Sequence, residues 1–573
     1  MKKKLAITIA LALTLLTAVF VLPGCGGGTQ QAPAEFVFQT GTNLKNEKYC
    51  YLTRYNGKSR EVVIPDEHDG VPVTYVADYA FKTGGKRIES VAFPDSVTEI
   101  WGGTFRYLPR LTSIIVSDDN PNYSTDDGNL YDKSGKTLIK YAQGKTAEEY
   151  SLNENAASEI ERIGGLAFFG ANSLRKITVG EGVSSIGYAA FGSCENLEEI
   201  TLPSSLSSTQ SALTYGSKNR VKVRINSLSA WCGVTNAGTT GSLYGCDLYV
   251  GEELADDITI SGVSKIADDA FRGCASVTSV TIDGPSEIGV CAFRECPNLK
   301  TATIGDSVET VGAYAFGHNP ALERATIGSG TTDIGFGIFS GSSELKSVEV
   351  AEENANYRSI DGSLYDKAAT RLLCFAGEST DCTVIDGVTA IDTYAFFMNG
   401  KVTGVTLPDS VTTIDSSAFY SCVALESVHF GSGVQTIGEN AFGYCVSLKS
   451  VELPASLTKM YQYAFEGCSS LETVTIAPGG LTELRQNTFE GCVSLKRFDI
   501  PYGVIALWWE VFKDCASMEE ITIPATVVSL TQDDFAGCPD SMVIKCEMKN
   551  KPEKWSYAWS GYYQVIWDYK NAA

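Results

Sequence analysis

The feature that most constrains the fold is a sequence repeat of about 23 residues between Leu425 and Asp540. Five consecutive segments share one apolar skeleton, L-x-x-V-x-L-P-x-x-V-x-x-I-x-x-x-A-F-x-x-C. The first six residues of each copy alternate between apolar and polar side chains, as in a strand that is buried on one face. A unit this short cannot bury its own apolar face, so consecutive copies must stack. The repeat therefore predicts a solenoid with one shared core.

The same repeat extends over nearly the whole chain. Its Phe recurs mostly at intervals of 22 to 24 residues, and three wider intervals predict inserts at residues 118–144, 207–265 and 352–378. We therefore expect a mainly β leucine-rich solenoid over residues 81–545, with a parallel strand face, short turns and no room for a globular enzyme domain. The fifteen occurrences are Phe81, Phe105, Phe168, Phe191, Phe271, Phe293, Phe316, Phe339, Phe396, Phe419, Phe442, Phe465, Phe489, Phe512 and Phe535.

Residues outside the repeat are expected to close the two ends of the array. Alternating apolar residues at 35–80 predict an N-terminal β cap and the start of the first repeat, and the aromatic segment 546–573 predicts a C-terminal cap. Such caps cover core faces and strand edges that the terminal repeats would expose.

The inserts 118–144 and 352–378 are twins. Both contain Asn-x-Asn-Tyr followed by Asp-Gly-x-Leu-Tyr-Asp-Lys, and the Asp-Gly pair favours a β-hairpin. The alternating oxygens of Asp118, Asn120 and Asn122 resemble calcium ligands, but Tyr123 and Asn129 occupy the places where a calcium loop needs Gly and Glu. No metal site is expected. The third insert, 207–265, contains the segments SLSAWCG, SLYGCDLYV and ITISGV; one interpretation of it is a separate binding module, which an exposed Trp231 would favour.

Residues 1–24 have the pattern of a secretory signal. Three lysines precede an apolar run from Leu5 to Leu22, and Cys25 follows Gly24. This pattern predicts a lipoprotein signal peptide that leaves a lipid on Cys25, with residues 25–34 as a flexible tether. The alternative is a permanent transmembrane helix, because the run is close to the length of a membrane span.

Charge and cysteine content agree with an exported protein. The formal net charge is −23, which argues against partners that carry phosphate and against binding to anionic lipid heads. Of the seventeen cysteines, nine lie three residues after a repeat Phe, where we expect buried free thiols. Two pairs in the irregular inserts, Cys232 with Cys246 and Cys374 with Cys382, are the better disulfide candidates, although the sequence leaves their state open.

The outward face of the strands is the candidate binding surface. Its fifth repeat position is mostly Thr, which suits an exposed parallel sheet. A long strip of hydroxyls suits an extended macromolecule rather than a small substrate. The residues that depart from this pattern are the candidates for specificity: Arg324, Glu349, His429, Glu452, Arg497 and Asp499.

An alternative candidate site consists of the tryptophans Trp231, Trp555 and Trp559, whose rings could stack on sugars. The competing interpretation of the last two is that they close the final core face. No nucleophile elbow, phosphate loop or Cys/His pair suggests catalysis, so we expect neither an enzyme nor a cofactor. The remaining catalytic alternative is a glycosidase, which would need a cleft that holds two carboxylates at a suitable separation, whereas a regular solenoid presents a shallow face.

The repeat skeleton, together with the phrases LPSSL, VTTIDSSAFYSC and LEEITLP, resembles the BspA-type leucine-rich repeat family, also called the Treponema pallidum type. The resemblance covers about residues 36–573. Proteins of this type carry a similar Leu-x-Ala-Trp-Cys segment, so the resemblance implies that the insert 207–265 is a strand-rich extension in line with the array. The resemblance also implies an exported bacterial surface protein that adheres to host or microbial surfaces, and the lipid expected on Cys25 would anchor it to the outer face of the membrane. We therefore expect a monomeric surface protein that recognises an extracellular protein or glycan. The alternative is a lipoprotein that captures polysaccharide through the three tryptophans.

Overall fold

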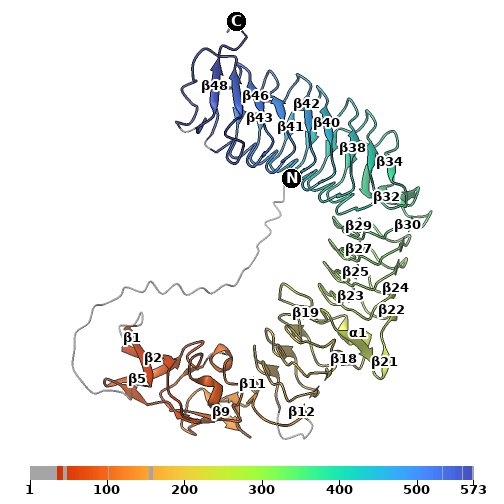
Figure 1. The fold of residues 1–573 in the computed structure, drawn as a ribbon. Coiled ribbons are helices and arrows are strands. Elements are labelled where there is room, and N and C mark those ends of the chain that lie inside the picture. The colour runs from red at the N-terminus through yellow and green to blue at the C-terminus, as the bar shows by residue number, and fades with distance from the viewer. Residues whose placement is uncertain are drawn as a thin grey trace, which may run out of the picture.

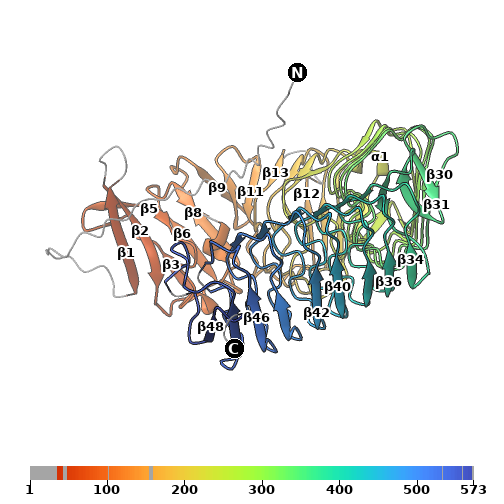
Figure 2. The same ribbon diagram turned by 90° about the horizontal axis from the view of Figure 1, so that it is seen from above.

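The computed structural model describes residues 35–42, 48–100, 102–153, 159–531, 533–557 and 559–570. It is a β-solenoid of about 22 turns that follows an open arc, with the N-terminal strands at one end and the C-terminal strands at the other (Figure 1). The fold class expected from the repeat is therefore confirmed. Viewed from above, the strands of the C-terminal half form a row of parallel arrows (Figure 2).

Each regular turn contributes one longer strand, which comes from the L-x-x-V-x-L part of the repeat. These strands pair in parallel, and side chains on one face of each strand are buried. The longer strands are β3 (Glu61–Val63), β6 (Ser90–Phe93), β8 (Ser113–Val116), β12 (Glu149–Leu152), β14 (Lys176–Val179), β16 (Glu199–Thr201), β18 (Lys222–Ile225), β20 (Asp247–Val250), β22 (Asp257–Ile260), β24 (Ser279–Ile282), β26 (Thr301–Ile304), β28 (Arg324–Ile327), β30 (Ser347–Val350), β34 (Asp381–Thr383), β36 (Gly404–Thr406), β38 (Ser427–His429), β40 (Ser450–Leu453), β42 (Thr473–Ile476), β44 (Arg497–Asp499), β46 (Glu520–Ile523), β47 (Val543–Cys546) and β48 (Gln564–Trp567).

The V-x-x-I part of the repeat forms a second row of parallel strands, each two residues long. In the middle of the molecule β23, β25, β27 and β29 lie on the inner side of the arc, whereas β22 and β24 lie on its outer side (Figure 1). The short strands are β7 (Glu99–Ile100), β13 (Arg162–Ile163), β15 (Ser185–Ile186), β17 (Ser208–Thr209), β19 (Thr235–Asn236), β23 (Lys265–Ile266), β25 (Glu287–Ile288), β27 (Thr310–Val311), β29 (Asp333–Ile334), β35 (Ala390–Ile391), β37 (Thr413–Ile414), β39 (Thr436–Ile437), β41 (Lys459–Met460), β43 (Glu483–Leu484) and β45 (Ala506–Leu507).

The remaining elements belong to the N-terminal end and the inserts. At the N-terminal end β1 pairs antiparallel with β2, which pairs in parallel with β5. Each twin insert forms three antiparallel strands, the last of which joins the short-strand row. These elements are β1 (Phe36–Thr42), β2 (Lys48–Tyr55), β4 (Glu67–His68), β5 (Val71–Val76), the 3-10 helices η1 (Gly85–Arg87) and η2 (Gly102–Phe105), β9 (Tyr123–Asp126), β10 (Asn129–Asp132), β11 (Thr137–Lys140), α1 (Leu228–Trp231), β21 (Glu253–Leu254), β31 (Tyr357–Ile360), β32 (Ser363–Asp366) and β33 (Arg371–Cys374).

The number of turns exceeds the fifteen that the repeat Phe predicts, because several turns lack this residue. In the region 207–265, strands β18 and β20 continue the longer row in register with β16. The turn between β16 and β18 buries Leu213 instead of Phe, and the turn between β18 and β20 buries Leu243. At the C-terminal end, β47 and β48 also continue the sheet in parallel. The Phe pattern therefore underestimates the length of the solenoid.

A stack of phenylalanine rings forms the centre of the core. Phe271 and Phe293 lie 4.8 Å apart and Phe419 and Phe442 lie 4.9 Å apart, measured between ring centroids, with nearly parallel ring planes. The repeat Phe side chains are almost completely buried. Offset stacking at this spacing stabilises aromatic pairs beyond the burial of their area, so the same residue in each turn aligns the turns with one another.

The repeat cysteines are free thiols, as expected, but they do more than fill space. The Sγ of Cys445 donates to the carbonyl oxygen of Phe419 in the preceding turn at 3.1 Å, and Cys422 contacts Phe396 in the same way at 3.0 Å. Where the array lacks Cys, Asn319 donates to the corresponding oxygen of Phe293 at 3.0 Å. The side chain at this repeat position therefore supplies a hydrogen bond to a buried carbonyl oxygen of the preceding turn; the oxygens of Phe419 and Phe396 also accept a backbone N–H each.

The two disulfide candidates are wrong, because all four cysteines are free thiols. Cys232 and Cys246 are completely buried, and the Sγ of Cys246 lies 3.2 Å from the hydroxyl of Thr214. Cys374 is buried and its Sγ donates to a backbone oxygen, while Cys382 is partly buried in β34. Their position in inserts favoured bridges, but the inserts are built into the solenoid and place these side chains among core residues.

Candidate functional site

The six residues expected to confer specificity lie on the longer strands with their side chains exposed, but they do not form one site. Arg324 on β28 and Glu349 on β30 belong to one sheet, where Glu349 lies beside Thr326. His429 on β38 and Glu452 on β40 lie in a second sheet. Arg497 and Asp499 lie on β44 in a third sheet.

The threonine strip is continuous within one sheet. Thr259, Thr281, Thr303 and Thr326 lie opposite one another on successive strands, and each is exposed or half-buried. Here the alternation of side chains along each strand correctly predicted which residues face solvent.

The alternative glycan site is ruled out by burial of its three tryptophans. Trp231 is 3% exposed and its Nε1 donates to the carbonyl oxygen of Ala270 at 2.8 Å. Trp555 is 2% exposed and Trp559 is 5% exposed, and their rings pack against each other with centroids 4.5 Å apart. No ring face is free to stack on a sugar, so these aromatic residues belong to the core.

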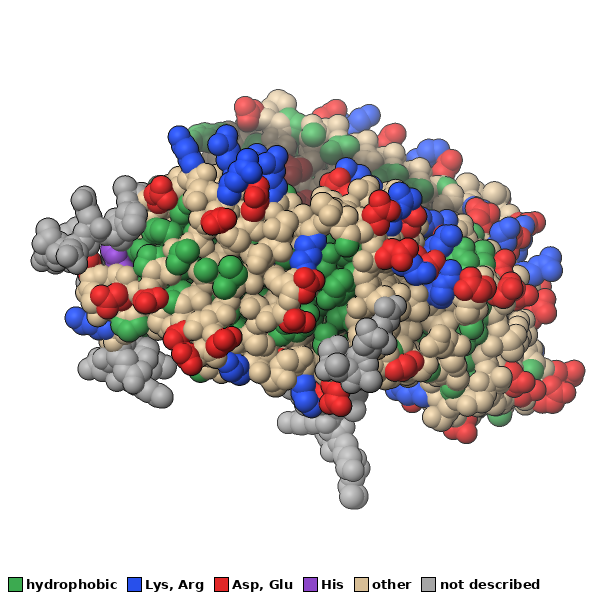
Figure 3. Space-filling view, turned by 90° about the horizontal axis from the view of Figure 1, so that it is seen from below, with side chains coloured by type: hydrophobic (Ala, Val, Ile, Leu, Met, Phe, Trp, Pro, Cys, Tyr) green, Lys and Arg blue, Asp and Glu red, His purple; other side chains and the backbone are tan. Residues whose placement is uncertain are grey.

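Several basic side chains on the strand faces are paired with acidic ones from a neighbouring turn. Examples are Lys176 with Glu199 at 3.2 Å and Lys265 with Glu287 at 2.6 Å. Acidic and basic side chains accordingly lie side by side on the surface seen from below (Figure 3). Exposed pairs of this kind contribute little stability each, and their mutual neutralisation leaves few basic groups for an anionic partner.

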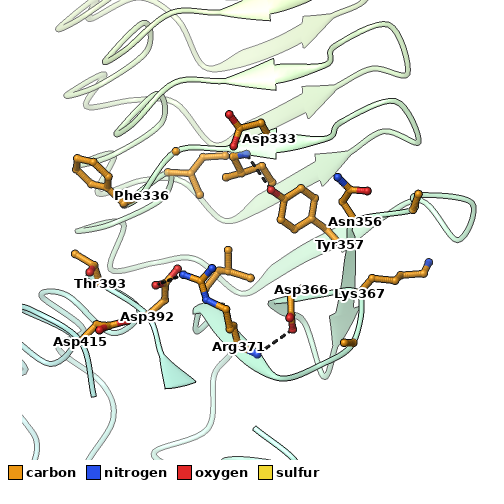
Figure 4. Close-up of a pocket in the computed structure, with 17 residues that line it drawn as sticks. Asp333, Phe336, Asn356, Tyr357, Asp366, Lys367, Arg371, Asp392, Thr393 and Asp415 are labelled. Atoms are coloured by element: carbon orange, nitrogen blue, oxygen red, sulfur yellow. Dashed lines mark hydrogen bonds and ion pairs between the residues drawn. The ribbon is translucent and has the colours of Figure 1, made fainter. Parts of the chain in front are cut away.

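A pocket lies where the second twin insert interrupts the array. Its volume is about 730 Å³, and its walls come from β29, β31, β33 and the residues after β35 and β37. We call it the acidic pocket, because Asp333, Asp366, Asp392 and Asp415 line it together with Lys367 and Arg371. Figure 4 shows Phe336 and Thr393 at one edge and Lys367 at the opposite edge.

The charged groups of the acidic pocket are unevenly neutralised. Arg371 binds Asp392 at 2.6 Å, and the carboxylate of Asp366 accepts the backbone N–H of Arg371 at 2.9 Å. Burial, followed by the negative charge of Asp392, raises the pKa of the Asp415 carboxyl above its usual value. Asp333 is exposed on β29.

A strip of aromatic side chains lies beside this pocket, and the sequence analysis missed it. Tyr314, Tyr394, Phe397 and Tyr420 line a groove of about 440 Å³ together with Arg294 and His318. We call it the aromatic groove. Its signal was present in the sequence: aromatic residues recur two positions before the repeat Phe, as at Tyr314 and Tyr394, and one position after it, as at Phe397 and Tyr420.

A second exposed aromatic pair was also missed. Trp508 is 41% exposed and Trp509 is 55% exposed, with ring centroids 6.3 Å apart. Both follow the short strand β45, at positions where other repeats carry small or polar residues such as Gly438 and Glu439. That departure from the repeat was the available signal.

Among the described residues, no group of His, Cys, Asp and Glu is arranged to hold a metal ion. No helix in the described part of the chain has both the length and the apolarity to cross a membrane. Cys25, the expected lipid attachment residue, lies outside the described residues.

Comparisons with known proteins agree with this architecture. Six copies of the model for the BspA type leucine rich repeat region match residues 54–129, 147–232, 254–368, 373–479 and 413–542. No curated protein sequence matches the chain.

Among solved structures, a leucine rich cell surface protein from Faecalibacterium prausnitzii is similar at 23% identity, over 82% of this chain and 94% of its own, with a TM-score of 0.34. A leucine-rich repeat protein from Eubacterium ventriosum is similar at 18% identity, over 78% of this chain and 93% of its own, with a TM-score of 0.38. The pneumococcal vaccine antigen PcpA is similar at 16% identity, over 94% of this chain and 98% of its own, with a TM-score of 0.33. Since the family model matches well over half of the sequence, the chain belongs to the BspA-type leucine-rich repeat family.

Proposed function

We propose that the protein is a binding protein of the bacterial cell surface, which recognises a macromolecule on host or microbial surfaces without catalysing a reaction. The observation that carries this proposal is the open arc of about 22 turns (Figure 1). A repeated surface of this shape suits a long partner, because contacts can be distributed over many turns.

Export and anchoring form part of the proposal. The signal-like segment 1–24 and the cysteine that follows it support a protein held on the outer face of the membrane by a lipid on Cys25, with a monomeric solenoid outside. Labelling with a radioactive fatty acid tests this point, because the Cys25→Ala variant should lose both the label and its retention in the membrane fraction.

Binding to a panel of immobilised extracellular-matrix proteins and polysaccharides tests the function itself. The protein should bind at least one macromolecule saturably, and the Glu349→Lys variant on the strand face should be compared with Asp283→Lys at another exposed position. A higher Kd for Glu349→Lys than for Asp283→Lys would assign binding to the strand face around Glu349. Absence of saturable binding to every macromolecule presented by host or microbial cells would contradict the proposal.

A further inference from the structure

The acidic pocket and the aromatic groove meet along one edge. Phe336 lines the pocket, and its ring centroid lies 5.2 Å from that of Tyr314 and 6.2 Å from that of Tyr394, both of which line the groove. Thr393, the residue before Tyr394, lies at the same edge of the pocket as Phe336 (Figure 4). A single extended ligand can therefore occupy both depressions.

The rings of the aromatic groove form ridges rather than a flat platform. Tyr314 is nearly perpendicular to Phe336, with an angle of 88° between the ring planes, and Tyr394 is nearly perpendicular to Phe397, with an angle of 85°. Beyond Phe397 the row continues to Tyr420, whose ring is stacked on Phe397 at 11°, and then to Tyr444, each step spanning 5.5 Å between ring centroids. The row of rings lines one groove, and aromatic-lined grooves recognise proline-rich segments in the polyproline II conformation. A pyranose needs instead a broad exposed ring face.

The charge of the pocket selects the sign of the ligand. Four carboxylates and two cationic side chains line it, so carboxylates outnumber cations by two. Arg371 pairs with Asp392, so three carboxylates, Asp333, Asp366 and Asp415, remain with one cation, Lys367. Carboxylates also accept hydrogen bonds from sugar hydroxyls. Only a cationic side chain such as Lys or Arg gains in addition from the excess negative charge.

We propose that the joined pocket and groove bind a basic, proline-rich segment of an extracellular protein. Its prolines pack in the groove against the rings of Tyr314, Tyr394, Phe397 and Tyr420, and a Lys or Arg side chain enters the acidic pocket past Phe336. This assignment rests on the proposed surface-binding function and specifies its partner class. The occupied region is the junction created by the second twin insert, so the insert builds a binding site as well as joining two parts of the array.

The test measures Kd for the purified protein with synthetic 12-residue peptides and neutral hexasaccharides of glucose and of xylose. One peptide is rich in proline with two arginines; the others replace each Arg by Gln or each Pro by Gly. We expect saturable binding of the first peptide, about fivefold or more weaker binding after either replacement, and weakening by salt. Phe336→Ser should reduce affinity by a similar factor, and Asp333→Asn should do so only for the peptide with arginines.

Matched controls separate these effects from changes in folding. Trp509→Ser is the control for Phe336→Ser, because the Trp509 ring is 55% exposed and the Phe336 ring 54%, but Trp509 lies far along the array. Asp283→Asn is the control for Asp333→Asn, because it removes an exposed carboxylate distant from the pocket. Both should leave peptide affinity unchanged. Failure to bind the basic peptide, or binding that Phe336→Ser does not affect, would overturn the proposal. Binding of a hexasaccharide alone, lost in Phe336→Ser, would overturn it in favour of a glycan.

Failure here and failure of the surface-binding function give different results. Binding of a matrix macromolecule that is insensitive to Phe336→Ser and is not competed by the peptide would leave the function intact and remove only this site. Loss of all macromolecular binding would contradict the function itself.

Discussion

At the scale of single residues, Lys140 is an ionisable group inside the core. It is 1% exposed, and its Nζ donates to the carbonyl oxygens of Leu166 at 3.2 Å and Phe169 at 3.0 Å. Burial lowers the pKa of its amine to about 7. In the twin insert the corresponding residue is Cys374, so the first insert places a titratable group where the second has a thiol.

This pKa makes the free energy of unfolding depend on pH. Above pH 7 the folded protein releases the proton of Lys140, whereas the unfolded chain retains it up to about pH 10.4. The unfolded state therefore binds more protons in this window, and the free energy of unfolding should rise with pH by up to about 1.4 kcal/mol per pH unit. Urea denaturation at several pH values should show this slope in the natural protein and not in Lys140→Met. Exposed Lys82→Met is the control, and equal slopes in all three proteins would contradict the assignment.

Asp534 gives a pH dependence of opposite sign. It is completely buried at the position that is Ala in most repeats, and its Oδ2 accepts hydrogen bonds from the N–H and hydroxyl of Thr531 at 2.9 and 3.1 Å. Burial raises the pKa of its carboxyl from 3.8 to about 7. Between these values the folded state binds more protons, so stability should fall as pH rises.

Substitution by the usual repeat residue tests this effect. Relative to the natural protein, Asp534→Ala should gain stability as pH rises from 4 to 7, by up to about 1.4 kcal/mol per pH unit. Thermal melts across this range, with exposed Asp540→Ala as the control, would reveal the difference. A constant offset between Asp534→Ala and the natural protein would refute it.

At the scale of one repeat, the sequence predicted the strands well and the corner between them poorly. The alternating residues of the longer strand and the buried Phe followed directly from the pattern. The corner contains two residues with positive φ in most repeats, such as Asn440 at 56° and Tyr444 at 57° on either side of Phe442. Glycine, which marks this conformation, occupies these positions in some repeats, as at Gly337 and Gly341, but other residues such as Asn and Tyr occupy them more often and conceal it. The aromatic groove is built from these corners, which is why its residues were missed.

The hydrogen bond from thiol to carbonyl within the repeat is open to direct measurement. Cys445→Ala removes one of the two donors to the Phe419 oxygen, which still accepts the backbone N–H of Cys422, so it should lower the free energy of unfolding by about 0.5–1.5 kcal/mol. Cys445→Ser keeps a donor and should cost less. Equilibrium urea denaturation under reducing conditions compares the two, with exposed Val423→Ala as the control. Equal losses for Ala and Ser would mean that the thiol serves only to fill volume.

At the scale of the whole molecule, the repeat predicted a solenoid, but it predicted neither the curvature of the solenoid nor the division of its core into separate hydrophobic clusters. The described hydrophobic core comprises three clusters, and each boundary between them falls at a twin insert. On β10, Leu130 packs into the N-terminal cluster and Tyr131 into the central one; on β32, Leu364 packs into the central cluster and Tyr365 into the C-terminal one. A strand that is apolar on both faces has no visible face pattern, so the sequence could not show that these hairpins separate two cores.

The inserts should therefore divide the solenoid into units that lose protection separately. Leu364 and Tyr365 are neighbours in the chain but point into different clusters, because side chains alternate along β32. Truncation of a buried side chain costs about 2–5 kcal/mol, mainly in the cluster that it fills. In hydrogen exchange followed by mass spectrometry, Leu364→Ala should reduce the protection of β28 and β30, and Tyr365→Ala that of β36 and β38. If both variants instead reduce protection equally on both sides of the insert, the array unfolds as one cooperative unit and β32 transmits stability rather than separating it.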